Sequence, residues 1–220
     1  MNDEPSHISV GGDLSGQVVA GDHNVVISAR DGSSVTVQGA VAPPRAEQTL
    51  PADVGDFVGR YDELQRLLAA VSDADDGPVR AVAIHAVDGM AGIGKTAFAV
   101  HAAHHLAARF PDGRLFVELR AHKPGQARVE PAAALATLLQ ADGVAAQQIP
   151  AGVDARAGLW RYRMATKRLL LVLDDAADTS HVAPLLPGAP GCLVLITSRR
   201  KLTTLPDAAF LSLDILPPEV

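Results

Sequence analysis

Residues 89–96 read Gly-Met-Ala-Gly-Ile-Gly-Lys-Thr, a glycine followed by four residues and then Gly-Lys-Thr. In a loop of this pattern, the missing glycine side chains let successive backbone N–H groups turn inward and surround phosphate oxygens. An apolar, strand-like run over residues 81–87 precedes the loop, and a helical run over residues 96–110 follows it. Such a helix aims the positive end of its dipole at the same phosphate. The stretch therefore predicts a strand, a phosphate-binding loop and a helix in direct succession.

The side chains of this loop have roles that follow from their chemistry. Lys95 offers a point charge to the β- and γ-phosphates, which makes it a catalytic candidate, and the Thr96 hydroxyl is a candidate ligand for Mg²⁺. We expect the nucleotide to contact the loop and the start of the helix, namely Gly89, Met90, Ala91, Gly92, Ile93, Gly94, Lys95, Thr96 and Ala97. The expected ligand is therefore a nucleoside diphosphate or triphosphate with Mg²⁺.

From Phe57 onward, apolar strand-like runs alternate with runs of helical periodicity. Helices are predicted over residues 61–72, 96–110, 131–140, 154–167 and 179–186, with Asp154 as the N-cap of the fourth. Strands are predicted over residues 81–87, 114–119, 169–173, 192–197 and 209–213. Strands that are apolar on both faces and alternate with helices indicate a mostly parallel sheet covered on both sides. The predicted class is α/β, a doubly wound, mostly parallel five-stranded P-loop NTPase sheet.

Acidic residues follow the third predicted strand, where residues 169–175 read Leu-Leu-Leu-Val-Leu-Asp-Asp. The carboxyl ends of parallel strands form the edge at which ligands bind in open α/β sheets. We assign Asp174 to Mg²⁺, directly or through a water. We assign Asp175 to orienting or deprotonating an attacking water. The alternative is that the two acids only cap the next helix.

Basic residues follow the fourth predicted strand, where residues 193–200 read Leu-Val-Leu-Ile-Thr-Ser-Arg-Arg. Arg199 is a candidate to detect the γ-phosphate, because a guanidinium group is planar, always charged and able to bind two oxygens. It therefore joins Lys95 and Asp175 as a catalytic candidate. The alternative is that Arg199 and Arg200 are solvated loop charges.

Composition and charge exclude several classes of protein. The 220 residues carry a net charge of −6, which offers no bulk positive field to a nucleic-acid backbone, so we expect no direct nucleic-acid binding. No apolar run approaches the ~20 residues that span a bilayer. The acidic N-terminus is unlike a signal peptide. We therefore expect a cytoplasmic location and no membrane contact.

Two kinds of reactive side chain are interpreted as structural. Cys192 is the only cysteine and lies in an apolar run, so we expect a buried small hydrophobe rather than a nucleophile. His101 and His105 share one helix face at a spacing of four residues, which can chelate a metal. Without an acidic helper, packing or solvated histidines are the preferred interpretation.

The first 40 residues differ in character from the rest. Short β-branched runs over residues 8–10, 17–19, 24–28 and 34–37 are separated by Gly- and Asp-rich turn signals. Three interpretations stay open: a disordered leader, a small β-meander or solenoid turn, and a self-templating β motif that pairs with a partner's copy. The predicted domains are a β-prone segment 1–40, a linker 41–55, a P-loop NTPase domain 56–216 and a truncated tail 217–220.

These motifs in this order, with Phe57-Val-Gly-Arg60 upstream, resemble the NB-ARC family of the STAND class of P-loop NTPases, in its bacterial signalling and regulatory branch. The resemblance covers about residues 50–216. It implies that the glycine-rich loop is a Walker A motif, that Asp174 and Asp175 form a Walker B pair, and that residues 197–199 form a sensor motif. Phe57 and Val58 would then line an adenine pocket, and Arg60 would anchor the nucleotide or the closed state. The sensor strand would lie between the Walker A and Walker B strands.

The resemblance also implies a function. ADP would hold an inactive state, and exchange for ATP would favour homo-oligomerisation or contact with an effector protein, with slow or no hydrolysis. Adenine is further favoured because the chain has no Asn-Lys-x-Asp motif of guanine readers. The family continues into helical and winged-helix domains, so a chain ending at Val220 is expected to be a fragment or a shortened protein, without tight ADP locking. The alternative function is an amyloid-like N-terminal interaction module regulated by the NTPase domain.

Overall fold

The computed structural model describes residues 16–20, 25–29, 49–55, 57–75 and 83–216. The chain divides into two compact units, residues 1–44 and 45–220. In the first unit, β1 (Gly16–Ala20) pairs antiparallel with β2 (Val25–Ala29). The strands expected over residues 17–19 and 24–28 correspond to this hairpin, whereas those expected over residues 8–10 and 34–37 lie outside the described residues.

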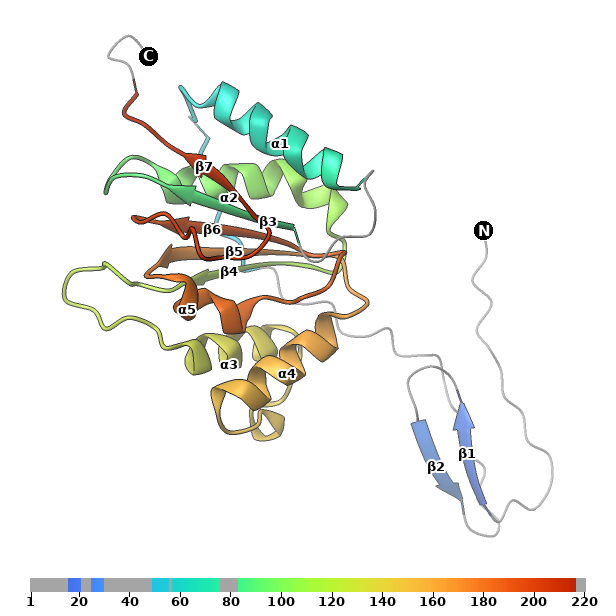
Figure 1. Ribbon diagram of the computed structural model, residues 1–220. Helices are drawn as coiled ribbons and strands as arrows, with labels where there is room; N and C mark the ends of the chain where they lie inside the picture. The colour runs from blue at the N-terminus through green and yellow to red at the C-terminus, as the bar shows by residue number, and fades with distance from the viewer. Residues whose placement is uncertain (1–15, 21–24, 30–48, 56, 76–82, 217–220) are drawn as a thin grey trace. The chain divides into compact units, whose positions relative to one another are not determined.

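The second unit alternates helices and strands, as its periodicity predicts (Figure 1). Its helices are α1 (Tyr61–Asp75), α2 (Lys95–Leu106), α3 (Pro131–Ala141), α4 (Val153–Met164) and α5 (Thr179–Val182). Its short 3-10 turns are η1 (Ala107–Arg109), η2 (Ala146–Gln148) and η3 (Ala183–Leu185). Its strands are β3 (Ala83–Asp88), β4 (Gly113–Glu118), β5 (Leu169–Ala176), β6 (Leu193–Ser198) and β7 (Ala208–Ser212).

The five strands form one sheet in the order β4-β5-β6-β3-β7, and every neighbouring pair is parallel. The predicted α/β class with a doubly wound, parallel five-stranded sheet is therefore confirmed. β6 lies between β3 and β5, which is the order that the resemblance implied for the sensor strand. This order brings the ends of β3, β5 and β6 together at the centre of the carboxyl edge.

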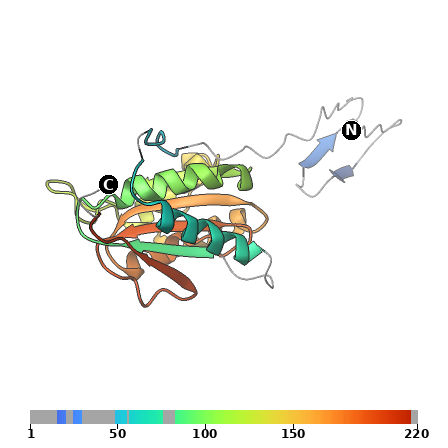
Figure 2. The same ribbon diagram turned by 90° about the horizontal axis from the view of Figure 1, so that it is seen from above.

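Two hydrophobic layers cover the two faces of the sheet. Leu169, Leu171 and Leu173 of β5 pack with residues of α3, α4 and α5. The alternate residues Leu170 and Val172 pack with residues of α1 and α2. Figure 2 shows α1 and α2 lying across the strands on that second face. Because both faces are covered, β5 and β6 are apolar along most of their length, which is why they read as continuous apolar runs.

Some predicted helix ends are wrong for local reasons. α4 begins at Val153 with Gly152 as its N-cap, so Asp154 lies in the first turn instead of capping the helix. The helix expected over residues 179–186 ends at Val182 and continues as η3, where Pro184 has no N–H to donate to an α-helical turn. These shifts leave the topology unchanged.

Candidate nucleotide site

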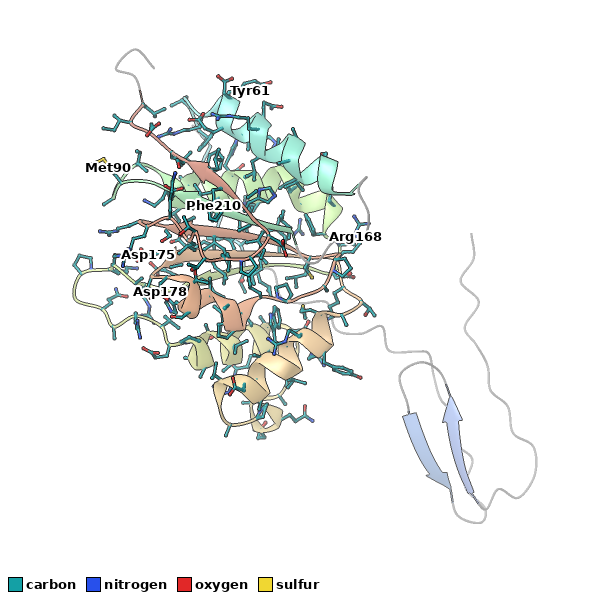
Figure 3. The ribbon with its side chains drawn as sticks, in the orientation of Figure 1. Tyr61, Met90, Arg168, Asp175, Asp178 and Phe210 are labelled. Carbon is teal, nitrogen blue, oxygen red and sulfur yellow. The ribbon has the colours of Figure 1, made fainter. Side chains whose placement is uncertain are left out.

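The glycine-rich loop lies at the carboxyl end of β3, a strand flanked on both sides in the sheet. Three of its glycines have positive φ: 153° at Gly89, 76° at Gly92 and 92° at Gly94, which is the N-cap of α2. Gly89 also lacks room for a side chain, because a Cβ there would lie 2.7 Å from the Leu213 carbonyl oxygen. Figure 3 shows Met90 and Asp175 at this carboxyl edge and Arg168 at the opposite edge. The loop is therefore a turn that glycine makes possible at an accessible sheet edge.

Lys95 folds back over its own loop. Its Nζ donates to the carbonyl oxygens of Gly89 at 2.8 Å and Met90 at 2.6 Å. Burial lowers the pKa of Lys95, and the positive charge of Arg199 lowers it further, against the opposing carboxylates of Asp175 and Asp174. The lysine, the arginine and the two acids singled out in the sequence thus share one electrostatic environment.

The two predicted Mg²⁺ ligands are in contact. The Thr96 hydroxyl donates to Asp174 Oδ1 at 2.7 Å, and the Thr197 hydroxyl donates to the same oxygen at 2.6 Å. Asp174 is 5% exposed, and burial raises its pKa, with the nearby Asp175 charge adding to the effect and the two hydroxyl bonds opposing it. A buried carboxylate beside a hydroxyl is a set of hard oxygen donors, which fits Mg²⁺. A bound cation would offset the free-energy cost of burying the Asp174 carboxylate.

Asp175 faces a residue that sequence reasoning missed, His122 on the loop after β4. The His122 backbone N–H donates to Asp175 Oδ2 at 2.7 Å, and His122 Nδ1 lies 2.9 Å from Oδ1. Arg199 Nη2 donates to the His122 carbonyl oxygen at 3.2 Å. The Asp175 backbone has a φ of 54°, and its N–H donates to the Thr197 hydroxyl at 2.9 Å. β4 pairs with β5, so the end of β4 lies beside the acids, a neighbour relation that spacing alone does not reveal.

A family model described as NB-ARC domain matches residues 62–209. The chain belongs to the NB-ARC family. The match spans α1 through β7, so this NB-ARC domain includes the loop, both acids and the arginine described above. The suspected resemblance is confirmed, and with it the coarse function of a nucleotide-binding P-loop domain.

Two curated proteins are similar to most of this chain. The regulatory protein AfsR of Streptomyces coelicolor is 40% identical over 190 residues, which cover 85% of this chain and 19% of AfsR. The regulatory protein AfsR of Streptomyces griseus is 42% identical over 170 residues, which cover 77% of this chain and 17% of that protein. This chain therefore spans less than a fifth of the length of the curated relatives it matches.

Similar solved structures include two that contain DNA. The Orc1 protein of Aeropyrum pernix, in complex with DNA, has a TM-score of 0.47 and 19% identity, over 72% of this chain and 46% of that one. Drosophila ORC bound to DNA has a TM-score of 0.46 and 16% identity, over 82% of this chain and 52% of that one.

In the NB-ARC domain, the residues predicted around the base lie beside the N-terminus of α1. Arg60 is 5% exposed, and its Nη2 donates to the carbonyl oxygens of Ile93 at 3.3 Å and Asp214 at 2.6 Å. Phe57 stacks on His101 with ring centroids 4.2 Å apart, while Val58 is 67% exposed. Arg60 therefore joins the phosphate loop to the segment that follows β7.

A hollow of about 190 Å³ lies next to these residues, lined by Phe57, Gly59, Arg60, Tyr61, Leu64, Gln65, His101 and His105. His101 Nδ1 lies 2.9 Å from Asp53 Oδ1, and its Nε2 lies 3.1 Å from His105 Nε2. Among the residues that the structure describes, no group of three or more possible metal ligands forms. The histidines instead link α2 to Pro51, Asp53 and Phe57, so part of the predicted linker packs on the domain.

The structure brings most of the predicted site residues to one edge of the sheet. Lys95, Thr96, Asp174 and Arg199 lie within direct or electrostatic reach of one another, as described above. Phe57 lies beside α1 and α2, where it stacks on His101, and Val58 is exposed. Within the described parts of the chain, no helix is long and apolar enough to cross a lipid bilayer.

Proposed function

We propose that this NB-ARC domain is an ATP/ADP-binding switch of the STAND type that acts in the cytoplasm and hydrolyses ATP slowly or not at all. The observation that supports it most is the contact between Thr96 and Asp174 beside the glycine-rich loop. It joins a loop suited to phosphates with a buried carboxylate suited to Mg²⁺.

Each residue of the loop edge has a proposed role. Backbone N–H groups of residues 89–97 and the Lys95 ammonium bind the phosphates, after Lys95 exchanges its two carbonyl partners for phosphate oxygens. Thr96 and Asp174 would hold Mg²⁺, which would neutralise negative charge on the phosphates. Arg199 detects the γ-phosphate, and Asp175 orients the attacking water. Weak ATPase activity is the expected consequence.

The base is proposed to bind near the N-terminus of α1. Phe57 and Val58 offer an aromatic ring and an exposed apolar side chain for adenine. Arg60 secures the closed state through the Ile93 and Asp214 carbonyl oxygens rather than through the nucleotide, since these bonds occupy its buried guanidinium.

The output of the switch is proposed to be regulatory. The relatives that match this chain are called regulatory proteins, and the chain shares 40–42% identity with them. ATP binding would favour homo-oligomerisation or contact with an effector protein, without direct binding of nucleic acid by this chain.

A calorimetric titration with ADP, ATP and GTP in Mg²⁺ tests the switch. We expect adenine nucleotides to bind with micromolar dissociation constants, and Lys95→Ala to weaken binding by about a hundredfold or more through loss of charge-assisted bonds. Arg161→Ala, at an exposed position of α4, removes a positive charge away from the loop, and this variant should bind nucleotides normally. A folded wild-type chain that binds none of the three nucleotides would contradict the proposal.

A second candidate function is an N-terminal interaction module that the NB-ARC domain regulates. The β1–β2 pair favours it, because within the described residues of this unit each strand has one backbone edge without a partner strand, which another strand can join. Deletion of residues 1–40 discriminates between the candidates. Loss of self-association with intact nucleotide binding supports the module, whereas unchanged self-association by light scattering contradicts it.

A further inference from the structure

Asp175 is held by one residue through both of its carboxylate oxygens. The His122 backbone N–H donates to Oδ2 at 2.7 Å, and His122 Nδ1 lies 2.9 Å from Oδ1. An ionised carboxylate only accepts, so this contact places the proton on Nδ1. The two side chains are 28% and 22% exposed, so solvent competes only partly for these bonds.

The backbone around this pair is fixed on both sides. The Asp175 N–H donates to the Thr197 hydroxyl at 2.9 Å, and the Ala121 N–H donates to the Asp175 carbonyl oxygen at 3.0 Å. Asp175 also sits at a φ of 54°, in a region that residues other than glycine seldom adopt. The side chain is therefore directed towards the loop after β4 by a backbone that does not readily turn.

Held in this way, Asp175 has one acceptor position of each carboxylate oxygen engaged by His122. Among the described residues of the phosphate loop, none donates a hydrogen bond to either carboxylate oxygen of Asp175, whereas Thr96 of α2 binds Asp174. A group that orients or deprotonates a water must present a free lone pair to it at hydrogen-bond distance. His122 thus occupies one acceptor position on each oxygen and fixes the orientation in which the remaining positions could meet a water.

Arg199 connects this arrangement to the nucleotide. Its Nη2 donates to the His122 carbonyl oxygen at 3.2 Å, and its side chain is exposed at the same sheet edge. A bond from a guanidinium to a phosphate is charge-assisted and stronger than a bond to a neutral carbonyl. A γ-phosphate would therefore draw Arg199 away from His122, whereas ADP offers no γ-phosphate to do so.

We propose that His122 is a positioning residue that restrains Asp175 in the resting state and releases it when Arg199 turns to a γ-phosphate. The inference rests on the proposed nucleotide switch and adds to it a residue outside the loop, the acid pair and the arginine. This restraint would explain why a site that contains both Asp174 and Asp175 hydrolyses ATP slowly, as proposed above.

The step under control is hydrolysis of the γ-phosphate. The water oxygen bonds to the γ-phosphorus, and the bond from that phosphorus to the oxygen bridging the β-phosphate breaks. ADP leaves with the bridging oxygen, and inorganic phosphate forms. The proton that the water loses passes to the Asp175 carboxylate and then to solvent.

Single-turnover hydrolysis of γ-labelled ATP by the full chain in Mg²⁺ tests the restraint. His122→Ala keeps the backbone bond but removes the ring, so we expect the rate constant to rise about threefold or more with unchanged ATP affinity. His122→Phe retains a planar ring without a donor and should show the same increase. It therefore keeps the test valid if the alanine variant folds poorly. His122→Asn places an N–H₂ near the position of Nδ1 and should restore the wild-type rate.

A double variant shows whether the effect passes through the acid. In Asp175→Asn, the further change His122→Ala should leave the rate unaltered. Equal or slower hydrolysis in both His122→Ala and His122→Phe would overturn the inference, as would an acceleration that persists in Asp175→Asn. Calorimetry on the same samples separates the two proposals. Absent ATP and ADP binding refutes the switch itself, whereas normal binding with unaltered rates refutes only the role of His122.

Discussion

The layer of α3, α4 and α5, the closed layer, contains a buried charged cluster, whereas the layer of α1 and α2, the open layer, borders a hollow. Asp142, at the end of α3, is fully buried and accepts hydrogen bonds from Arg163 and Lys167. Trp160 of α4 is also fully buried, and its Nε1 donates to the Leu185 carbonyl oxygen at 2.8 Å. Every polar group named here has a partner within that layer.

The α1–α2 layer is more open. A hollow of about 190 Å³ lies between Phe57 and these helices, and Tyr61 at its edge is 71% exposed. The buried Arg60 side chain forms hydrogen bonds that join the phosphate loop to the segment after β7. The difference indicates that the α3–α5 layer mainly stabilises the sheet, whereas the α1–α2 layer presents the phosphate loop to a ligand. Ligand-binding loops generally belong to the less stable part of a fold.

The strongest test of the closed layer is Asp142→Asn. This change leaves Arg163 and Lys167 without a counter-charge, so we expect the free energy of unfolding to fall by about 3 kcal/mol. Urea denaturation followed by circular dichroism measures it. Asp207→Asn, at an exposed position whose φ of 56° asparagine tolerates, should change stability by less than about 0.5 kcal/mol. Nucleotide affinity should be unaltered in both variants, and a loss confined to Asp142→Asn would show that the layers are coupled.

His85 on β3 tests the opposite layer, since it lies on the same strand face as Val87, which packs with α1 and α2. Burial lowers the pKa of His85 to about 4 from its usual 6.5. The unfolded chain therefore binds the proton more readily than the folded chain, and stability falls as the pH drops from 6.5 towards 4. We expect a loss of about 2 kcal/mol between pH 7 and pH 5.

Denaturation at both pH values, with His85→Leu as the comparison, isolates this contribution. The leucine variant should lose about 2 kcal/mol less than the wild type over that range. His105→Leu, an exposed change on α2, should retain the wild-type dependence. Parallel curves for wild type and His85→Leu would mean that burial does not lower the pKa of His85 in the folded chain.

Arg60→Lys tests the hydrogen bonds of the open layer. A lysine cannot reach Glu63, Ile93 and Asp214 in the way that the guanidinium fork does. We expect the free energy of unfolding to fall by about 1 kcal/mol and ADP to bind several-fold more weakly. Arg66→Lys, an exposed position of α1, is the matched control. A stability loss with unaltered ADP affinity would show that the Arg60 hydrogen bonds do not support the phosphate loop.

Much of this architecture could be predicted from local sequence. The loop at residues 89–96 depends on glycine conformation, and the apolar runs of β5 and β6 depend on burial at both faces, so each leaves a strong local pattern. The proximity of Thr96 to Asp174 followed from placing both at the carboxyl edge of one sheet.

Other contacts could not be predicted, because they join segments that no short pattern links. His122 meets Asp175 only because β4 pairs with β5, and Arg60 meets Asp214 across 154 residues of sequence. The predicted N-cap at Asp154 failed because Gly152, with a φ of 84°, caps α4 two residues earlier. Such features depend on strand order and on the exact path of a loop.

The smallest expected effect is that of ATP on the reactivity of Cys192, which tests whether the closed layer stays closed. Its thiol is buried among residues of the α3–α5 layer, and burial raises its pKa to about 11. At pH 8, about one thiol in a thousand is then ionised, so a disulfide reagent should react more than about a hundredfold faster with the urea-unfolded chain than with the native one. Absorbance of the released thiolate follows both reactions.

Saturating ATP with Mg²⁺ should leave the native rate of this reaction unaltered. The nucleotide is proposed to bind at the loop and the α1–α2 layer, and the thiol reacts only when the α3–α5 layer opens. A second sample carrying Asp142→Asn provides the positive control, because loss of the buried carboxylate makes that opening more frequent and the thiol should react faster. If ATP alone accelerated the wild-type reaction, the α3–α5 layer would move with the nucleotide and could not be a passive support.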